Sequence, residues 1–141
     1  MIVPDVNVLV YAYNADAARH PLARQWWEHA INSGAAIGLP WISALGFIRL
    51  MTHPRVGANP LPVTTAIEHV RSWLARSNVR ILTPGERHAE ILFALLEAVG
   101  VAGNLTTDAH LAALAIEYHA ELVSTDADFA RFPKLRWRRL A

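Results

Sequence analysis

Two hydrophobic patterns alternate along the chain: continuous apolar runs and apolar residues at helical spacing. Residues 2–13 are rich in Val, Leu and Tyr with little polar alternation, which is typical of a strand buried on both faces. Shorter runs at residues 36–39, 79–82 and 121–124 predict further strands, and residues 135–137 are a candidate for one more. Strands buried on both faces indicate a parallel sheet.

Helical periodicity fills the segments between these runs. Apolar residues recur three and four positions apart in residues 20–31, 41–52, 64–76, 86–99 and 107–119. Pro21 stands near the start of the first segment and Gly34 just past its end, which is the usual asymmetry of helix ends. His53 ends the second segment because a residue before proline is pushed out of the helical region. Residues 14–16 and 57–62 are predicted loops.

Strands separated by helices predict an α/β fold. The alternation indicates a three-layer sandwich with a central parallel sheet of about four or five strands. The 141 residues fit a single domain over residues 1–141, and 53% hydrophobic residues are enough to fill its core. No internal repeat or low-complexity linker divides the chain.

Composition removes several classes of protein. The chain has no cysteine, so it has no disulfide framework, thiolate metal site or cysteine nucleophile. A net charge of +1 does not fit a polybasic protein that wraps nucleic acid. The amino-terminal segment lacks the cationic region of a signal peptide, and we expect no membrane span and a cytoplasmic location.

Four of the five aspartates fall at the ends of predicted elements or in a buried run. Asp126 and Asp128 follow a strand, Asp108 opens a helix, and Asp5 lies early in the first apolar run. Ligands of open parallel sheets bind at the carboxyl ends of the strands. Carboxylates gathered there repel and raise one another's pKa unless a metal ion lies among them. Oxygen ligands without cysteine favour Mg²⁺ or Mn²⁺.

Each of these aspartates also has a purely structural interpretation. Asp108 can stabilise a helix N-terminus through the macrodipole, and Asp126 can cap the turn that follows its strand. An ionised carboxylate in a buried strand needs a partner, and structural hydrogen bonds alone can supply one for Asp5. Asn7 can orient the Asp5 carboxylate or bond to nearby backbone.

Three segments of the chain resemble the acidic motifs of PIN-domain ribonucleases, and in particular those of the VapC-type toxins of type II toxin–antitoxin systems. These segments are DVNVLVYA at residues 5–12, TDAHLAALA at 107–115 and STDADF at 124–129. Their order and spacing and the total length agree with the family, so the resemblance covers essentially the whole chain.

The resemblance implies a metal-dependent endoribonuclease toxin that cleaves RNA, forms a homodimer and is inhibited by a small VapB-like antitoxin. Carried over residue by residue, Asp5 and Asp108 are the principal metal ligands, Asp126 is a third acidic ligand, and Asp128 is an accessory carboxylate. The first three are the expected catalytic residues, with Mg²⁺ or Mn²⁺ as cofactor. Arg49 is a candidate phosphate contact by its family position. A divalent ion held by few carboxylates keeps waters, one of which can attack a phosphodiester.

One position departs from the family's pattern. The second motif usually carries a glutamate three residues before an arginine, and Gly46 stands there ahead of Arg49. Residues 29–67 contain no acidic residue that could replace it. A site with one carboxylate fewer favours a single ion, weak metal affinity or reduced activity. Gly46 motivates one alternative, a catalytically weak PIN-like domain that binds RNA or protein. A second alternative is a metal-dependent phosphatase acting on small molecules, because similar carboxylate clusters also serve phosphoryl chemistry.

Five cations surround Trp137 near the carboxyl terminus: Arg131, Lys134, Arg136, Arg138 and Arg139. Such cations can contact RNA phosphates while the indole stacks on a base. The alternative is a terminal strand, in which alternation buries Leu135 and Trp137 and leaves Arg136 and Arg138 in solvent.

Overall fold

The order of strands places β1 at the centre of the sheet. The computed structural model describes residues 1–55 and 59–140. Its strands are β1 (Ile2–Pro4), β2 (Ile37–Pro40), β3 (Val79–Leu82), β4 (Glu121–Ser124) and β5 (Trp137–Arg139). They pair in parallel in the order β3-β2-β1-β4-β5. The chain builds outward from β1 through β2 and β3 and then returns to the other side of β1, so the strand order reverses at β1.

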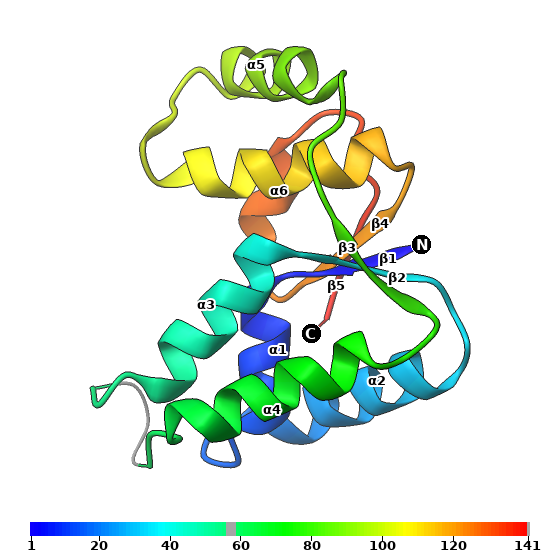
Figure 1. Cartoon of the computed structure of the whole chain (residues 1–141). Helices are drawn as coiled ribbons and strands as arrows, with labels where there is room; N and C mark the ends of the chain where they lie inside the picture. The colour runs from blue at the N-terminus through cyan, green and yellow to red at the C-terminus, as the bar shows by residue number, and fades with distance from the viewer. Residues whose placement is uncertain (56–58, 141) are drawn as a thin grey trace.

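Helices cover both faces of the sheet (Figure 1). One layer contains α1 (Val6–Tyr13), α2 (His20–Asn32), α3 (Trp41–Thr52) and α4 (Val63–Leu74), and the other contains α5 (His88–Val99) and α6 (Thr106–Glu117). Two 3-10 helices, η1 (Gly103–Leu105) and η2 (Ala127–Arg131), lie in connections. The predicted three-layer α/β sandwich with a parallel sheet is confirmed. No helix of residues 1–55 and 59–140 is long and apolar enough to cross a membrane.

A buried core lies on each side of the sheet. Trp27, Phe47 and Trp73 pack in the layer of α1 to α4, where the rings of Trp73 and Phe47 meet at 4.8 Å between centroids. Leu122 and Phe129 are fully buried in the second core, under α5 and α6. The two cores fix the position of the sheet between them, because the inner strands β2 and β4 bury side chains on both faces.

The first apolar run contains a strand and a helix, so the predicted strand over residues 2–13 is wrong. β1 ends at Pro4 and α1 begins at Val6. Asp5 between them has extended backbone angles, and its Oδ1 accepts a hydrogen bond from the Val6 amide at 2.7 Å. Asp5 is therefore the N-cap of α1. A continuous apolar run does not separate a buried strand from a buried helix, which is why the sequence pattern misled.

The other elements follow the predictions closely. β3, β4 and α3 have the predicted bounds, and α2, α4, α5 and α6 differ at their ends by one or two residues. β2 extends to Pro40, and β5 begins at Trp137, where the predicted run ends. Part of the predicted loop at 57–62 lies outside the described residues, since these resume at Asn59.

Helices α1 and α3 approach each other closely at Gly46. A Cβ atom at this position would lie 2.6 Å from Cγ2 of Val6, which is in the first turn of α1. One turn earlier on α3, the Ser43 hydroxyl donates a hydrogen bond to the Pro4 carbonyl at 2.8 Å. The absence of a side chain at Gly46 and the Ser43 bond together let α3 lie against the end of β1.

The substitution Gly46→Ala should lower the free energy of unfolding by about 1 kcal/mol, because overpacking costs more than the gain in helix propensity. Val6→Ala in the same chain removes the methyl groups that the new Cβ would meet. The double variant should therefore be more stable than the sum of the two single effects predicts. Urea unfolding of the four chains measures this coupling, and strictly additive effects would show that Val6 does not limit residue 46.

Candidate functional site

The carboxyl ends of β1 and β4 lie side by side where the strand order reverses. Pro4 pairs with Val123 in the sheet, and the Asp5 amide donates to the Val123 carbonyl at 2.9 Å. The residues that follow these two strands, Asp5 and Thr125, therefore leave the sheet together. In open α/β sheets this is the edge where ligands bind.

Asp5 and Asp108 share a small pocket at this edge. Its lining residues are Asp5, Val6, Ile42, Ser43, Thr107, Asp108 and Leu111. Asp108 reaches the pocket from the first turn of α6, and Asp5 from the end of β1. The pocket has a volume of about 60 Å³, which leaves room for an ion with a few water molecules and not for a nucleoside.

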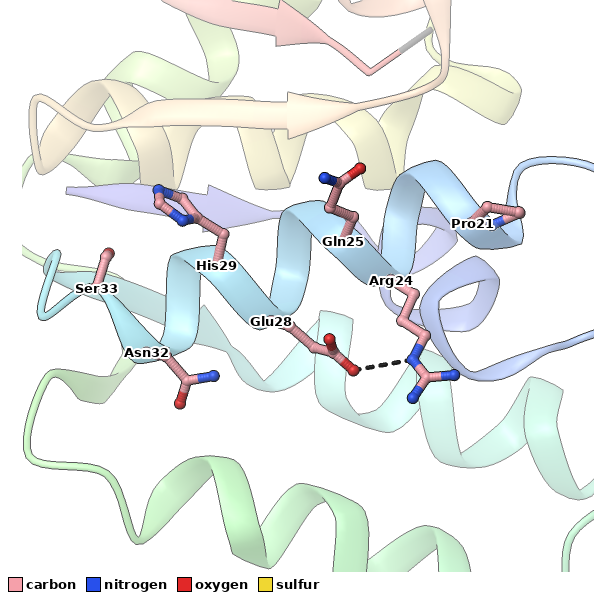
Figure 2. Close-up of a pocket in the computed structure, with 7 residues that line it drawn as sticks. All are labelled: Pro21, Arg24, Gln25, Glu28, His29, Asn32 and Ser33. Atoms are coloured by element: carbon pink, nitrogen blue, oxygen red, sulfur yellow. Dashed lines mark hydrogen bonds and ion pairs between the residues drawn. The ribbon is translucent and has the colours of Figure 1, made fainter.

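Larger hollows lie away from these carboxylates. One of about 480 Å³ is an open depression along the outer face of α2, lined by that helix and its end (Figure 2). There the Arg24 guanidinium pairs with Glu28 at 2.8 Å, so the two charges compensate each other. None of the candidate aspartates lines this hollow, and we do not assign it to the site.

The Ser124 hydroxyl connects the segments that carry the candidate residues. It donates to Oδ2 of Asp5 at 2.7 Å and accepts hydrogen bonds from the Asp126 amide at 3.0 Å and Nδ2 of Asn7 at 3.3 Å. Asn7 also accepts from the Thr125 amide at 3.4 Å. Asn7 thus orients Asp5 through Ser124, and not by direct contact. The role of Ser124 was not predicted, although its position as the last residue of a buried strand, two residues before Asp126, is a signal that could have found it.

Asp126 and Asp128 lie near the pocket without lining it. Oδ1 of Asp126 accepts from the Asp128 amide at 2.9 Å, so Asp126 caps η2 as its structural interpretation predicted. Both carboxylates still raise the pKa of Asp108 electrostatically. Within the part of the chain that the structure describes, no three carboxylates or imidazoles are close enough to hold one ion together in this conformation. Asp5 and Asp108 therefore share the pocket, whereas Asp126 caps η2 with one carboxylate oxygen and does not line the pocket.

The environment of these carboxylates disfavours their charged forms. Burial raises the pKa of Asp5, and the hydrogen bonds from Ser124 and Val6 offset only part of this effect. The pKa of Asp108 rises to about 6, first through burial and then through repulsion from Asp5, Asp126 and Asp128. Among residues 1–55 and 59–140, no basic side chain forms an ion pair with any of these four aspartate carboxylates.

This donor set fits a hard divalent ion. The available ligands at the pocket are carboxylate and hydroxyl oxygens, which suit Mg²⁺ or Mn²⁺. Burial, more than repulsion, raises the pKa of Asp5 and Asp108, and no basic side chain of the described residues pairs with either carboxylate, so a cation between them would stabilise their charged forms.

Two further residues singled out from the sequence lie away from the pocket. Arg49 is exposed in the last turn of α3, about 9 Å along the helix axis beyond Ser43, and it does not line the pocket. Its phosphate contact stays a prediction. Gly46 faces Val6, so the space next to this position is filled by a valine methyl group.

The comparisons with known proteins agree with this arrangement. The family model for the PIN domain matches residues 2–135. Ribonuclease VapC33 of Mycobacterium tuberculosis is 47% identical over 137 residues, which cover 97% of this chain and 96% of that protein. Ribonuclease VapC37 of the same organism is 42% identical over 97% of this chain and 95% of its own length. The chain therefore belongs to the PIN-domain family. Within it, the chain groups with the VapC ribonucleases, as its three acidic motifs predicted.

Solved structures share the fold at lower sequence identity. VapBC2 from Rickettsia felis, bound to a DNA fragment from its promoter, superposes with a TM-score of 0.71 at 21% identity, covering 99% of this chain and 98% of that chain. VapC20 of Mycobacterium tuberculosis, a toxin that cleaves the sarcin-ricin loop, gives 0.69 at 17% identity, with coverage of 96% and 99%. At these identities the likeness establishes the fold.

Asp108→Asn should stabilise the metal-free chain at neutral pH by about 1 kcal/mol, a figure reduced for the solvent exposure of this half-buried group. The folded pKa of about 6 exceeds the ordinary 3.8, so the folded chain binds more protons between these values. The stability from this protonation is complete below about pH 4 and is lost as the pH rises through about 6. Urea unfolding in EDTA at several pH values should show this loss in the wild type and a weaker one in the variant. Equal pH dependence in both chains would contradict the raised pKa.

Ser124→Ala should destabilise the chain by about 1–3 kcal/mol, because Asp5 loses a buried donor and the Asp126 amide loses its acceptor. Removal of the hydroxyl should also raise the pKa of Asp5 further, since the hydrogen bond favours the charged carboxylate. Ser72→Ala is the matched control, because the Ser72 hydroxyl is exposed and bonds only within its own helix. Thermal unfolding compares the stability of the two variants. Similar small losses of stability in both would contradict the connecting role of Ser124.

Proposed function

We propose that this chain is the endoribonuclease toxin of a type II toxin–antitoxin module and that it hydrolyses RNA phosphodiester bonds with Mg²⁺ or Mn²⁺. The observation that carries the proposal is the pair of uncompensated carboxylates, Asp5 and Asp108, in one ion-sized pocket. We assign these two as the principal ligands. Asp126 is the third catalytic ligand and Asp128 the accessory carboxylate.

The contacts of the chain assign each ligand a task. Asp5 is fixed by its bonds from Ser124 and the Val6 amide, and each of its oxygens keeps a lone pair for an ion. Burial and neighbouring carboxylates act on Asp108 without an offsetting hydrogen bond from the described residues, so its oxygens are free to bind. Asp126 completes the set by moving toward the pocket, and its Oδ2 accepts no hydrogen bond from the described residues. A bound divalent ion would supply a water of lowered pKa and neutralise charge developing on the phosphate.

The close contact at Gly46 supports a site for one ion. No acidic side chain is present between residues 29 and 67, and Val6 occupies the space beside position 46. A second divalent ion would have little charge compensation on this side of the pocket. The alternative of a weak, non-catalytic domain has less support, because the near full-length relatives are named as ribonucleases.

The partners follow from the same family. Similar folds occur in VapBC complexes of Rickettsia felis and Haemophilus influenzae, which supports a VapB-like antitoxin as the partner of this chain. RNA is the proposed substrate and a homodimer the proposed assembly. Exposed apolar side chains on α3, Trp41 and Leu45, are consistent with a surface that a second protein chain covers.

Cleavage of a mixed RNA pool by the purified chain, with Mg²⁺, Mn²⁺ or EDTA, tests the proposal. Cleavage should require the metal, and Asp5→Asn and Asp108→Asn should each lower its rate by about 100-fold or more, because each removes a charged ligand. Asp16→Asn is the matched control, since Asp16 is exposed in the connection between α1 and α2.

Each contrary result has a definite meaning. Cleavage that persists in EDTA or in both site variants would come from another nuclease. It would contradict the assignment of Asp5 and Asp108 as the catalytic site. Release of inorganic phosphate from small phosphomonoesters without RNA cleavage would favour the phosphatase alternative. An inactive wild type that still binds RNA would favour the weak binding domain.

A further inference from the structure

The sheet register separates the two arginines of β5. Val123 pairs with Arg138, and Ser124 pairs with Arg139. Paired residues of neighbouring parallel strands point to the same face, and successive residues point to opposite faces. Arg139 therefore projects from the face on which the Ser124 hydroxyl holds Asp5, whereas Arg138 projects toward α2.

The neighbouring arginines have partners of their own. The guanidinium of Arg138 lies 6.0 Å from the ring of Trp26 on α2, and its Nε is 3.6 Å from Oε1 of Glu121. Arg136 donates to the His119 carbonyl at 3.4 Å. Arg139 is exposed, and within residues 1–55 and 59–140 it has neither an ion pair nor a cation–π contact. The position of Arg138 is thus explained by its contacts as a strand residue, whereas packing gives no reason for the arginine at position 139.

The backbone of Arg139 is fixed beside the candidate site. Neighbouring strands are about 4.8 Å apart, so the Arg139 and Ser124 backbones adjoin directly. The Leu140 amide donates to the Ser124 carbonyl at 2.8 Å and holds the end of β5 at the carboxyl edge. From Ser124 the hydroxyl reaches Asp5 at 2.7 Å. The backbone of Arg139 is therefore separated from the end of β1, and so from Asp5, by the strand β4 alone.

The charge of the site gives this arginine a task. Four carboxylates repel a polyanion that approaches the pocket, and a single ion neutralises only part of their charge. A guanidinium is the side chain best suited to bind a phosphate through two parallel hydrogen bonds. We propose that Arg139 positions RNA by binding a phosphate next to the one that is cleaved, an inference that rests on the proposed function.

RNA binding by chains that cannot cleave tests this role. In the Asp108→Asn background, the affinity for a labelled single-stranded RNA from the cleaved pool is measured over a range of salt concentrations. Arg139→Ala should weaken binding about 3- to 10-fold and reduce the slope of log K against log salt by about 0.7, the value for one phosphate contact on a single strand. Arg139→Lys should keep the slope and lose part of the affinity, because the charge stays and the two-pronged geometry goes.

Arg76→Ala is the matched control. Arg76 is exposed, binds Oδ1 of Asn32 and lies just before the start of β3, at the opposite edge of the sheet. The substitution Arg76→Ala removes the same charge and should leave the RNA affinity and its salt dependence unchanged. In the cleaving chain, Arg139→Ala should raise KM and leave kcat within about twofold, because the arginine binds away from the reacting atoms.

The outcomes separate this role from the proposed function. Unchanged affinity and salt slope in Arg139→Ala, with cleavage intact in the wild type, would overturn the role of Arg139 alone. Equal losses of RNA affinity in Arg139→Ala and Arg76→Ala would indicate a general effect of charge and would also overturn the proposed role of Arg139. A wild type that neither cleaves nor binds RNA would overturn both proposals. The thermal unfolding temperature of Arg139→Ala should equal that of the parent chain, which shows that a loss of binding is not caused by a loss of fold.

Discussion

The hydrogen bond between the Ser124 hydroxyl and the Asp5 carboxylate is the contact on which the site depends. A hydroxyl has one donor and two acceptor positions, and Ser124 uses all of them, on Asp5, Asn7 and the Asp126 amide. The end of β1, the start of α1 and the loop after β4 are therefore held by one oxygen atom. Asp5 takes part in the same way, because it caps α1 with one oxygen and binds Ser124 with the other.

The electrostatics of the pocket oppose the stability of the fold. Burial, and to a smaller extent repulsion from neighbouring carboxylates, raises the pKa of Asp5 and Asp108, so the ionised chain is less stable than one with neutral side chains at these positions. Such a cost is expected where a site is organised for function and not for stability. The apolar cores on both faces of the sheet keep the carboxylates together in spite of it.

Local sequence patterns predicted most of the fold. Strand and helix alternation gave the parallel three-layer sandwich, and the bounds of β3, β4 and α3 were correct. The failure at residues 2–13 has a physical cause, since the cap formed by Asp5 depends on backbone geometry that an apolar run does not reveal. Asp108, Asp126 and Asp128 were recognised because they stand at a helix start or after a strand, and Asp5 because a charged group in a buried apolar run needs a partner.

The finer features of the site depend on tertiary contacts. The bonds of Ser124 to Asp5 and Asn7 and the valine beside Gly46 arise between segments that are distant along the chain. The same holds for the C-terminal cations. Alternation along a strand distinguishes Arg138 from Arg139, but only the register with β4 shows which of them faces the site.

The reversal of strand order at β1 also determines when the site can exist. Asp5 and Ser124 are 119 positions apart, and Asp5 directly follows β1, the first strand of this domain. The central strand β1 pairs with its second neighbour only after β4 has been synthesised, and such long-range pairing is slow to form. During synthesis, a partly made chain holds Asp5 without Asp108, Ser124 or Asp126. The pocket is therefore assembled only after the segment from Asp5 to Asp126 has emerged, so a growing chain that ends before β4 carries no complete site beside the ribosome that makes it.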